Sequence, residues 1–242
     1  MAGQVRALVL SGLLFLPGVS PAGEPETGNA WLTAGISAGL VGAAFLGDRS
    51  ARDWAREHQN GRADNILTSA EMMGQWQVAI PAAALYAGGM AFESQKAKDA
   101  VVSAALASAI GPGLVTQALK YSIGRARPRQ DLGILHVRPF SGDVSFPSGH
   151  TAQAFSFASA VSETCQSLWV SVPLYAAATL TGIARIYHDA HFLSDVTAGA
   201  VIGTLSGVYS ARYIRGRTSR DKVVLAPFYD SGAPGLAVSA GF

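Results

Sequence analysis

Three short polar segments, each at the edge of an apolar stretch, carry the residues best suited to chemistry. The first runs from Lys120 to Pro128 and holds Lys120, Arg125 and Arg127. Arginine grips two oxygens of an anion through its planar fork, and lysine adds a point charge. Because Arg127 precedes a proline, we expect its backbone to be extended. This segment predicts an anion site, or alternatively the cationic flank of a membrane helix.

The second segment, Ser145–Thr151, stands directly before an apolar stretch. Ser148 is a candidate N-cap, and Gly149 would let the backbone approach a ligand closely. The start of a helix attracts anions through its free N–H groups and its dipole. His150 would then lie beside a bound group, ready to give or take a proton. The alternative is a capped helix with an incidental histidine.

The third segment, from Arg185 to Asp195, contains His191 four residues before Asp195. On a helix these two side chains share a face and can hydrogen-bond. A carboxylate on one ring nitrogen leaves the other nitrogen nucleophilic. His188, His191 and Asp195 are alternatively metal ligands, although no further ligand cluster completes such a site. A simple polar helix cap is the third interpretation.

Together the three spacings resemble the signature of the type 2 phosphatidic acid phosphatase and vanadium haloperoxidase superfamily. The sequence reads Lys, six residues, Arg-Pro; then Pro-Ser-Gly-His; then Arg, five residues, His, three residues, Asp. These motifs run from Lys120 to Asp195, and the pattern of apolar segments extends the resemblance to Ala30–Arg212. One position departs, because Ala184 stands where that family usually has serine. The resemblance implies activity, with the missing hydroxyl affecting its efficiency.

The resemblance also implies a role for each motif residue. His191 would attack phosphorus and form a phosphohistidine, Asp195 would hold His191, and His150 would protonate the leaving alcohol and then activate water. The residues that would hold the phosphate are Lys120, Arg127, Ser148, Gly149 and Arg185. No metal and no cofactor is implied. His191 must be neutral while His150 is protonated, so we expect their pKa values to be pushed apart.

Three residues lie within the motifs but off the superfamily's fixed positions, namely Arg125, His188 and Asp189. We interpret them as rim residues that tune the choice of substrate.

The elements that position these segments are predicted to be helices. Hydrophobic residues make up 49% of the 242-residue chain and charged residues only 14%, against ~25% charged in a typical soluble domain. Six uncharged stretches have lengths that suit helices spanning or nearly spanning a bilayer. They are 30–47, 72–92, 100–119, 151–162, 164–184 and 196–211. We therefore predict an all-α, largely transmembrane six-helix bundle with the active site at one end, and amphipathic interfacial helices over 48–71.

The chain divides into three predicted regions. Residues 1–22 carry a positive n-region, a short apolar run and a Ser-Pro-Ala pattern, which is typical of a cleaved signal peptide or of an N-terminal anchor. Residues 30–215 form the helical phosphatase domain, and 216–242 a C-terminal tail. In the tail, residues 236–242 alternate between apolar and small types, which fits either a short strand or disorder. The single cysteine, Cys165, excludes an internal disulfide.

These observations predict a metal-independent phosphatase of the bacterial cell envelope that acts on a phosphomonoester or diphosphate, expected to be a lipid phosphate. The expected location is the inner membrane, with several crossings and a periplasm-facing site; a soluble periplasmic bundle acting on small phosphomonoesters is the alternative. A vanadium haloperoxidase and a non-catalytic lipid-phosphate-binding membrane protein are further alternatives. A net charge of +2, without a basic run among aromatics, does not indicate nucleic acid. Head group, topology and oligomeric state stay open.

Overall fold

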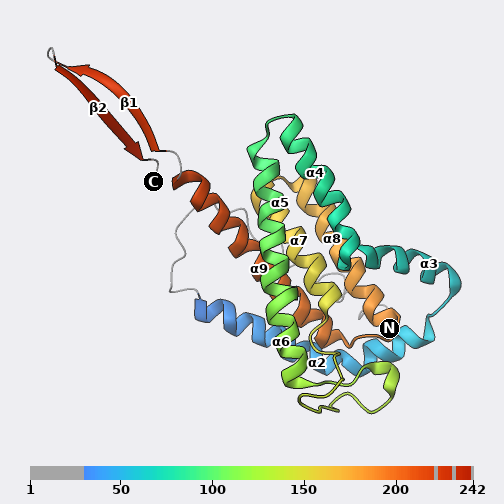
Figure 1. The fold of residues 1–242 in the computed structure, drawn as a ribbon. Helices are drawn as coiled ribbons and strands as arrows, with labels where there is room; N and C mark the ends of the chain where they lie inside the picture. Colours follow the sequence, from blue (N-terminus) through green and yellow to red (C-terminus); the bar gives the residue numbers. More distant parts are fainter. Residues whose placement is uncertain (1–29, 221–222, 231–232, 241–242) are drawn as a thin grey trace.

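The computed structural model describes residues 30–220, 223–230 and 233–240. The side chains of Met73, Trp76 and residues 218–240 are outside that description. The predicted signal peptide or anchor at 1–22 also lies outside the described residues. The described chain is a helical bundle, with a two-stranded hairpin after the last helix (Figure 1). The predicted all-α bundle is thus confirmed. The division into leader, domain and tail stays a prediction.

Each predicted apolar stretch contains a helix, but several boundaries differ. The helices and strands are α2 (Ala30–Glu57), α3 (Gly61–Ala70), α4 (Ala79–Ala91), α5 (Gln95–Ser108), α6 (Thr116–Ile123), α7 (Gly149–Cys165), α8 (Leu168–Tyr187), α9 (Leu193–Arg220), β1 (Val223–Asp230) and β2 (Ala233–Ala240). Short 3₁₀ turns cover Glu71–Gly74, Trp76–Val78 and Pro128–Gln130. The third stretch is continuous from α5 to α6 through a π-helical turn, Ala109–Val115, that contains Pro112. Proline removes a backbone donor, which explains why regular α-helical bonding is interrupted there.

Helix α7 lies at the centre of the bundle and packs against α5, α8 and α9. Its contact with α9 is close because Gly199, Gly203 and Gly207 recur every four residues on the facing side of α9. A Cβ atom at Gly203 would collide with the carbonyl oxygen of Ala152, and one at Gly207 with the side chain of Ser159. Small residues let the two backbones approach, as in membrane helix pairs. This contact fixes the start of α7 against the start of α9, where the second and third motifs lie.

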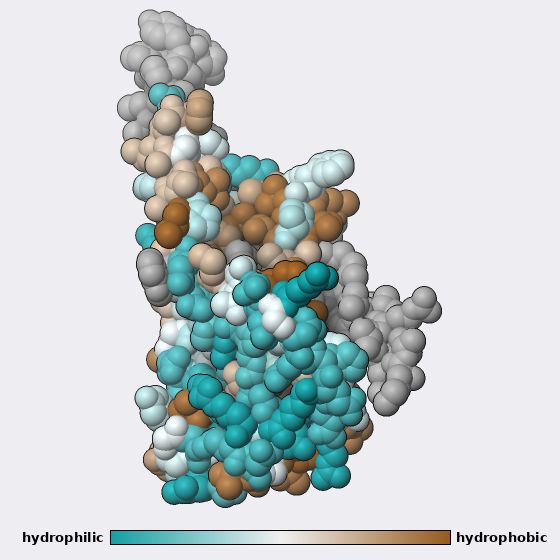
Figure 2. Space-filling view, turned by 90° about the vertical axis from the view of Figure 1, so that its right-hand side faces the viewer, coloured by the Kyte–Doolittle hydropathy of each residue, from teal (hydrophilic) through white to brown (hydrophobic). Residues whose placement is uncertain are grey.

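Two helical stretches are long and apolar enough to cross a membrane by length and composition, Trp31–Glu57 and Gln95–Ile123, within the described residues. Helix α2 contains the first of them and runs across the lower end of the bundle in Figure 1, extending to Glu57. Residues 48–57 of the predicted interfacial segment 48–71 continue α2, and α3 begins at Gly61. On the face in Figure 2, hydrophilic residues gather over the lower half and hydrophobic ones over the upper part.

The chain after α9 pairs as an antiparallel hairpin of β1 and β2, with Val223 opposite Ala240 and Asp230 opposite Ala233. Of the two alternatives for the tail, the structure has the strand.

Candidate active site

The three polar segments converge on one cavity of about 750 Å³. Lys120 reaches it from the end of α6, Arg127 from the following loop, His150 from the start of α7, and His191 from the loop between α8 and α9. Gly149 also lines the cavity. Residues up to 71 positions apart in the sequence therefore meet at one place, as the motif analysis predicted.

His191 and Asp195 form the pair expected from their spacing, although by a different local geometry. The Nδ1 atom of His191 lies 3.6 Å from Oδ2 of Asp195, and both side chains are buried. Helix α9 begins at Leu193, so His191 precedes the helix instead of sharing a face on it. Because Nδ1 faces the carboxylate, Nε2 is the ring nitrogen left for the cavity. That arrangement suits a nucleophile with a fixed ring orientation.

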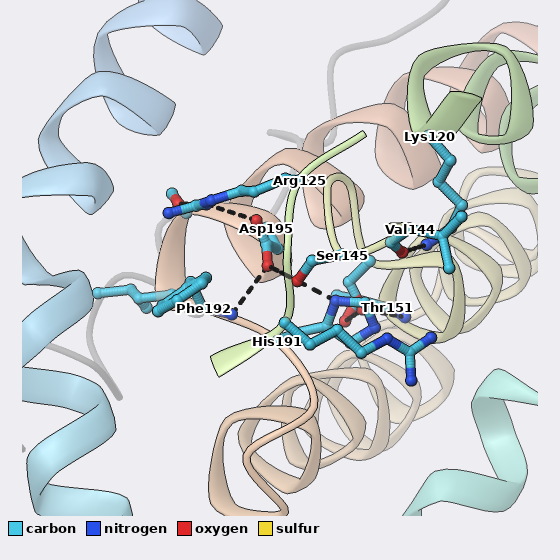
Figure 3. Close-up of polar contacts among 12 residues, drawn as sticks. Lys120, Arg125, Val144, Ser145, Thr151, His191, Phe192 and Asp195 are labelled. Atoms are coloured by element: carbon cyan, nitrogen blue, oxygen red, sulfur yellow. Dashed lines mark hydrogen bonds and ion pairs between the residues drawn. The ribbon is translucent and has the colours of Figure 1, made fainter. Parts of the chain in front are cut away.

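Asp195 is held in place by hydrogen bonds from three further groups, and Figure 3 shows the two that reach its carboxylate. Its Oδ2 atom accepts the hydroxyl of Ser145 at 2.6 Å and the backbone N–H of Phe192 at 2.9 Å. The N–H of Ser148 donates to the Asp195 backbone carbonyl at 2.9 Å. Sequence reasoning assigned Ser145 no role, because a serine three residues before a cap gives no signal of a partner fifty positions away.

Arg125 also binds Asp195, through a buried ion pair. The interpretation of Arg125 as a rim residue is therefore wrong. Its side chain is 2% exposed, and its Nη1 atom lies 2.6 Å from Asp195 Oδ1. The Nη2 atom lies 2.7 Å from Asp48 Oδ2, and Asp48 is fully buried. The rings of Phe45 and Phe192 cover the guanidinium, with centroids 4.8 and 4.2 Å from its carbon. A buried cation between two carboxylates therefore helps to hold Asp195 in place, and two of the residues around it, Phe45 and Asp48, come from α2.

Lys120 and Arg127 form the cationic side of the cavity. Lys120 is buried and its Nζ atom donates to the Val144 carbonyl at 2.5 Å (Figure 3). Arg127 is extended, with φ −81° and ψ 153°, as its place before proline predicted. In the described part of the chain neither cation has a carboxylate within ion-pair distance. Burial, and then the charges of Arg129 and Arg185, lower the pKa of Arg127. Unpaired, mutually repelling cations favour an anion between them.

Arg185 lies outside the lining of the cavity and is paired with a carboxylate that sequence reasoning missed. Its Nη1 atom lies 2.6 Å from Oε2 of Glu71, and Oε1 of Glu71 lies 2.7 Å from Nδ1 of His188. Glu71 is itself buried, in the 3₁₀ turn that packs on α7 and α8. The Nε atom of Arg185 is buried without a hydrogen-bond partner. The phosphate contact expected of Arg185 stays a prediction.

Ser148 caps α7 as predicted. Its Oγ atom accepts from the Thr151 backbone N–H at 3.5 Å and from the Thr151 hydroxyl at 2.9 Å. Both bonds use Ser148 as acceptor, so its own hydroxyl proton is left to donate. A Cβ atom at Gly149 would lie 3.6 Å from Lys120 Cε, which is ordinary contact. The phosphate contacts expected of Ser148 and Gly149 remain predictions.

A family model described as the PAP2 superfamily matches residues 100–219, which include all three polar segments. The chain belongs to the PAP2 superfamily. This confirms the resemblance that the motif spacing predicted.

Named relatives within this superfamily match over part of their length. The lipid A 1-phosphatase of Porphyromonas gingivalis is 41% identical over 109 residues, covering 44% of this chain and 22% of that protein. The lipid A 1-phosphatase of Rhizobium etli is 38% identical over 96 residues, covering 38% of this chain and 40% of that protein. The chain therefore spans less than half the length of these relatives.

Two solved structures resemble the bundle over most of their own length. The crystal structure of Aquifex aeolicus LpxE is 27% identical, with a TM-score of 0.53 over 69% of this chain and 95% of that one. The transmembrane PAP2-type phosphatidylglycerolphosphate phosphatase from Bacillus subtilis is 20% identical, with a TM-score of 0.56 over 87% and 96%. At that identity the second likeness supports the PAP2 fold alone.

Burial shifts the pKa values of the two histidines of this PAP2 site in the same direction. Burial, and then the charge of Arg185, lower the pKa of His150 to about 4. Burial also lowers the pKa of His191 to about 4, although Asp195 opposes the shift. The expectation that the two values are pushed apart is therefore wrong for the protein alone. A phosphate dianion among the cations would raise the pKa of His150, which lines the same cavity.

The difference between the pKa of His150 in the free protein and its pKa beside a bound phosphate predicts a pH profile that changes on substrate binding. Since kcat/KM reports the free protein and kcat the complex, we expect the alkaline limb of kcat to lie above that of kcat/KM. A bound opposite charge shifts a neighbouring pKa by 1–3 units, so the separation should reach about one pH unit or more. Steady-state phosphate release between pH 4 and 9 measures both limbs. Coincident limbs would show that the bound phosphate does not restore the proton on His150.

Proposed function

We propose that this protein is a metal-independent lipid-phosphate phosphatase that acts through a phosphohistidine at His191. The observation that carries this proposal is the lining of the cavity. Two histidines and two unpaired cations line one part of it, and apolar residues of α4, α5, α7 and the π-helical turn line another part, here called the apolar arm. A phosphate joined to a long hydrocarbon chain matches this lining, with the phosphate at the cations and histidines and the chain along the apolar residues.

The apolar arm is lined by small and aliphatic residues and by one phenylalanine. They are Val78, Ala79, Ala82, Val101, Ala104, Ala105, Pro112, Gly113 and Phe157. Small side chains on α4 and α5 leave room for a chain of methylene groups, which bind through apolar burial. A water-soluble phosphomonoester would leave this arm unused. The arm therefore favours a lipid phosphate over the soluble acid phosphatase alternative.

The proposed reaction has two steps. The lone pair of His191 Nε2 attacks phosphorus and the bond to the leaving oxygen breaks, while His150 gives that oxygen a proton. Water then attacks the phosphohistidine, His150 takes its proton, and inorganic phosphate leaves with His191 restored. Lys120 and Arg127 would stabilise the equatorial oxygens, with Ser148, the Gly149 N–H and Arg185 assisting. Positioning and charge stabilisation supply most of the catalysis in phosphoryl transfer.

Two further residues support the nucleophile in this proposal. Asp195 keeps the proton on Nδ1 of His191, and Arg125 keeps Asp195 ionised and oriented through the contact of 2.6 Å. In the described part of the chain no group of three or more His, Cys, Asp or Glu side chains is placed to hold a metal ion.

We place the protein in the bacterial cell envelope, in the inner membrane with the site facing the periplasm. The continuous stretch Gln95–Ile123 has 29 residues, which at about 1.5 Å each exceeds a hydrocarbon core of about 30 Å. Lys96 and Lys98 near one end and Lys120 near the other would then lie at the two membrane boundaries. This puts the phosphate site at head-group depth. The names of the relatives make a lipid A phosphate the first substrate to test.

Phosphate release in the presence of EDTA tests the proposal, with lipid A and phosphatidic acid in mixed micelles beside a soluble phosphomonoester. We expect EDTA-resistant, vanadate-sensitive release that prefers a lipid. The variant Ala105→Trp would fill the apolar arm and should lower activity on lipids more than on the soluble ester. Ala83→Trp, exposed on α4 outside the cavity lining, is the matched control. Equal effects on both substrates would argue for the soluble acid phosphatase, and no release from any substrate for the binding protein.

A further inference from the structure

The segment between α6 and α7 exposes large apolar side chains at the site end of the molecule. Leu132 is 52% exposed, Leu135 75% and Phe140 83%. Val137 is also exposed. In Figure 1 this segment forms the lowest part of the bundle, and Figure 2 shows hydrophobic residues along the same lower edge beneath a polar face. Single exposed apolar residues are ordinary, but a cluster on one short segment indicates a contact surface.

This segment has a fixed shape. The N–H of Arg138 donates to the Gly124 carbonyl at 2.7 Å, and that of Ala126 to the His136 carbonyl at 3.0 Å. The guanidinium of Arg125 donates to the Ile134 carbonyl at 2.6 Å. Gly124 has φ +62°, and a Cβ atom there would collide with the Arg138 carbonyl. The backbone of this segment therefore folds back on Gly124 and Arg125, and these hydrogen bonds fix the positions of the exposed side chains.

Phe140 is held in an unfavourable conformation while making little use of its ring for folding. Its φ is +58°, in the left-handed region that a bulky residue rarely adopts. Its N–H donates to the Tyr121 carbonyl at 2.7 Å, which keeps it there. A strained, exposed aromatic side chain contributes little to the stability of the fold. This conformation indicates that the ring of Phe140 is buried by a binding partner.

The charges around the cluster indicate what that partner is. Arg129 and Arg138 are exposed on the same segment, and among the described residues neither forms an ion pair. The nearby acids are engaged, since Asp131 pairs with Arg56 at 2.9 Å and Asp143 accepts from Gln130 at 3.0 Å. Cations beside aromatic and aliphatic side chains match an anionic lipid surface.

The cluster also lies beside the mouth of the cavity. Tyr121 lines the cavity, is itself exposed, and accepts the hydrogen bond from Phe140. We propose that Leu132, Leu135, Val137 and Phe140, with Arg129 and Arg138, form a lipid-docking segment that inserts into an anionic bilayer surface at the entrance of the site. This rests on the proposed function, because docking there sets the depth at which a lipid phosphate meets the cavity.

A fluorescent probe tests the docking without reference to activity. In a Cys165→Ser background, Phe140→Cys carries an environment-sensitive label in the full chain reconstituted into bilayers. We expect a blue shift and quenching by brominated lipid in phosphatidylglycerol-containing bilayers, with little change in phosphatidylcholine alone. A label that iodide quenches from water in both bilayers would overturn the proposal. A label shielded from water and lipid alike would indicate a second copy or another protein, and would overturn it too.

Kinetics supply an independent test. Each surface cation contributes about 1 kcal/mol to anionic membrane binding, so Arg138→Gln should raise KM for a bilayer lipid phosphate roughly fivefold. Leu135→Asp with Phe140→Asp should also raise this KM. Both variants should leave kcat and KM unchanged for a soluble phosphomonoester in detergent. If wild type hydrolyses neither substrate the proposed function fails, whereas equal losses on both substrates would overturn the docking segment alone.

Discussion

We expect His191→Ala to abolish phosphate release from a lipid phosphate and a soluble phosphomonoester alike. In the proposed mechanism His191 supplies the electron pair that forms the covalent intermediate, and removing a nucleophile lowers kcat by about 10⁴-fold or more. The fold should survive, because His191 lines the cavity and its Nδ1 atom lies 3.6 Å from Asp195 Oδ2, beyond hydrogen-bond distance, so no hydrogen bond of the fold is lost. Release of inorganic phosphate in EDTA, with circular dichroism to confirm folding, measures the effect.

Trapping the intermediate makes this test specific to the mechanism. Wild-type protein quenched during turnover of a ³²P-labelled substrate should carry an acid-labile, base-stable phosphoryl group, and His191→Ala should carry none. His58→Ala is the matched control, since His58 stacks on Trp54 outside the cavity lining. It should keep wild-type activity and labelling. Activity that survived the loss of His191, or label that remained, would assign the nucleophile elsewhere.

Much of the site could be predicted because its residues occur in short local patterns. Lys120, Arg127, His150 and His191 each stand where a helix starts or ends, and spacing within each segment revealed them. Asp48 and Glu71 carry no such pattern. Asp48 pairs with Arg125 across 77 positions, and Glu71 binds His188 across 117. Only the packing of α2 and of the 3₁₀ turn on the bundle brings these carboxylates to their cations.

The helices could be predicted from the lengths of the uncharged stretches, but the residues at which they begin and end could be predicted less well. The uncharged stretch 72–92 predicted one helix, but α4 begins at Ala79 after two 3₁₀ turns. That irregular start lets Gly74 lie against His150, where a Cβ atom would be 2.7 Å from the histidine Cβ. Arg125 was misjudged for a related reason. Within the segment Lys120–Pro128 it is a third cation and looks like another rim residue of the anion site. The carboxylates and aromatic rings that bury it come from elsewhere in the chain.

The largest stability effect is expected at Arg125, because it compensates two buried carboxylates. Arg125→Met would leave Asp48 and Asp195 without their counter-charge, and breaking a buried ion pair by removing one partner costs about 3–5 kcal/mol. We expect a clear fall in the midpoint of thermal unfolding and loss of activity. Arg212→Met is the matched control, since Arg212 is half exposed beside Glu163 and such pairs contribute about 0–1 kcal/mol.

A double variant separates the structural role of Arg125 from its role in the site. Adding Asp48→Asn to Arg125→Met removes one uncompensated charge, so part of the lost stability should return. Activity should not return, because Asp195 would still lack the contact with Nη1 that holds it toward His191. Unfolding midpoints and kcat for the wild type, both single variants and the double variant measure this cycle. Recovery of stability and activity together would mean that Arg125 only holds α2 against the bundle, whereas stability without activity would show that its charge supports the nucleophile.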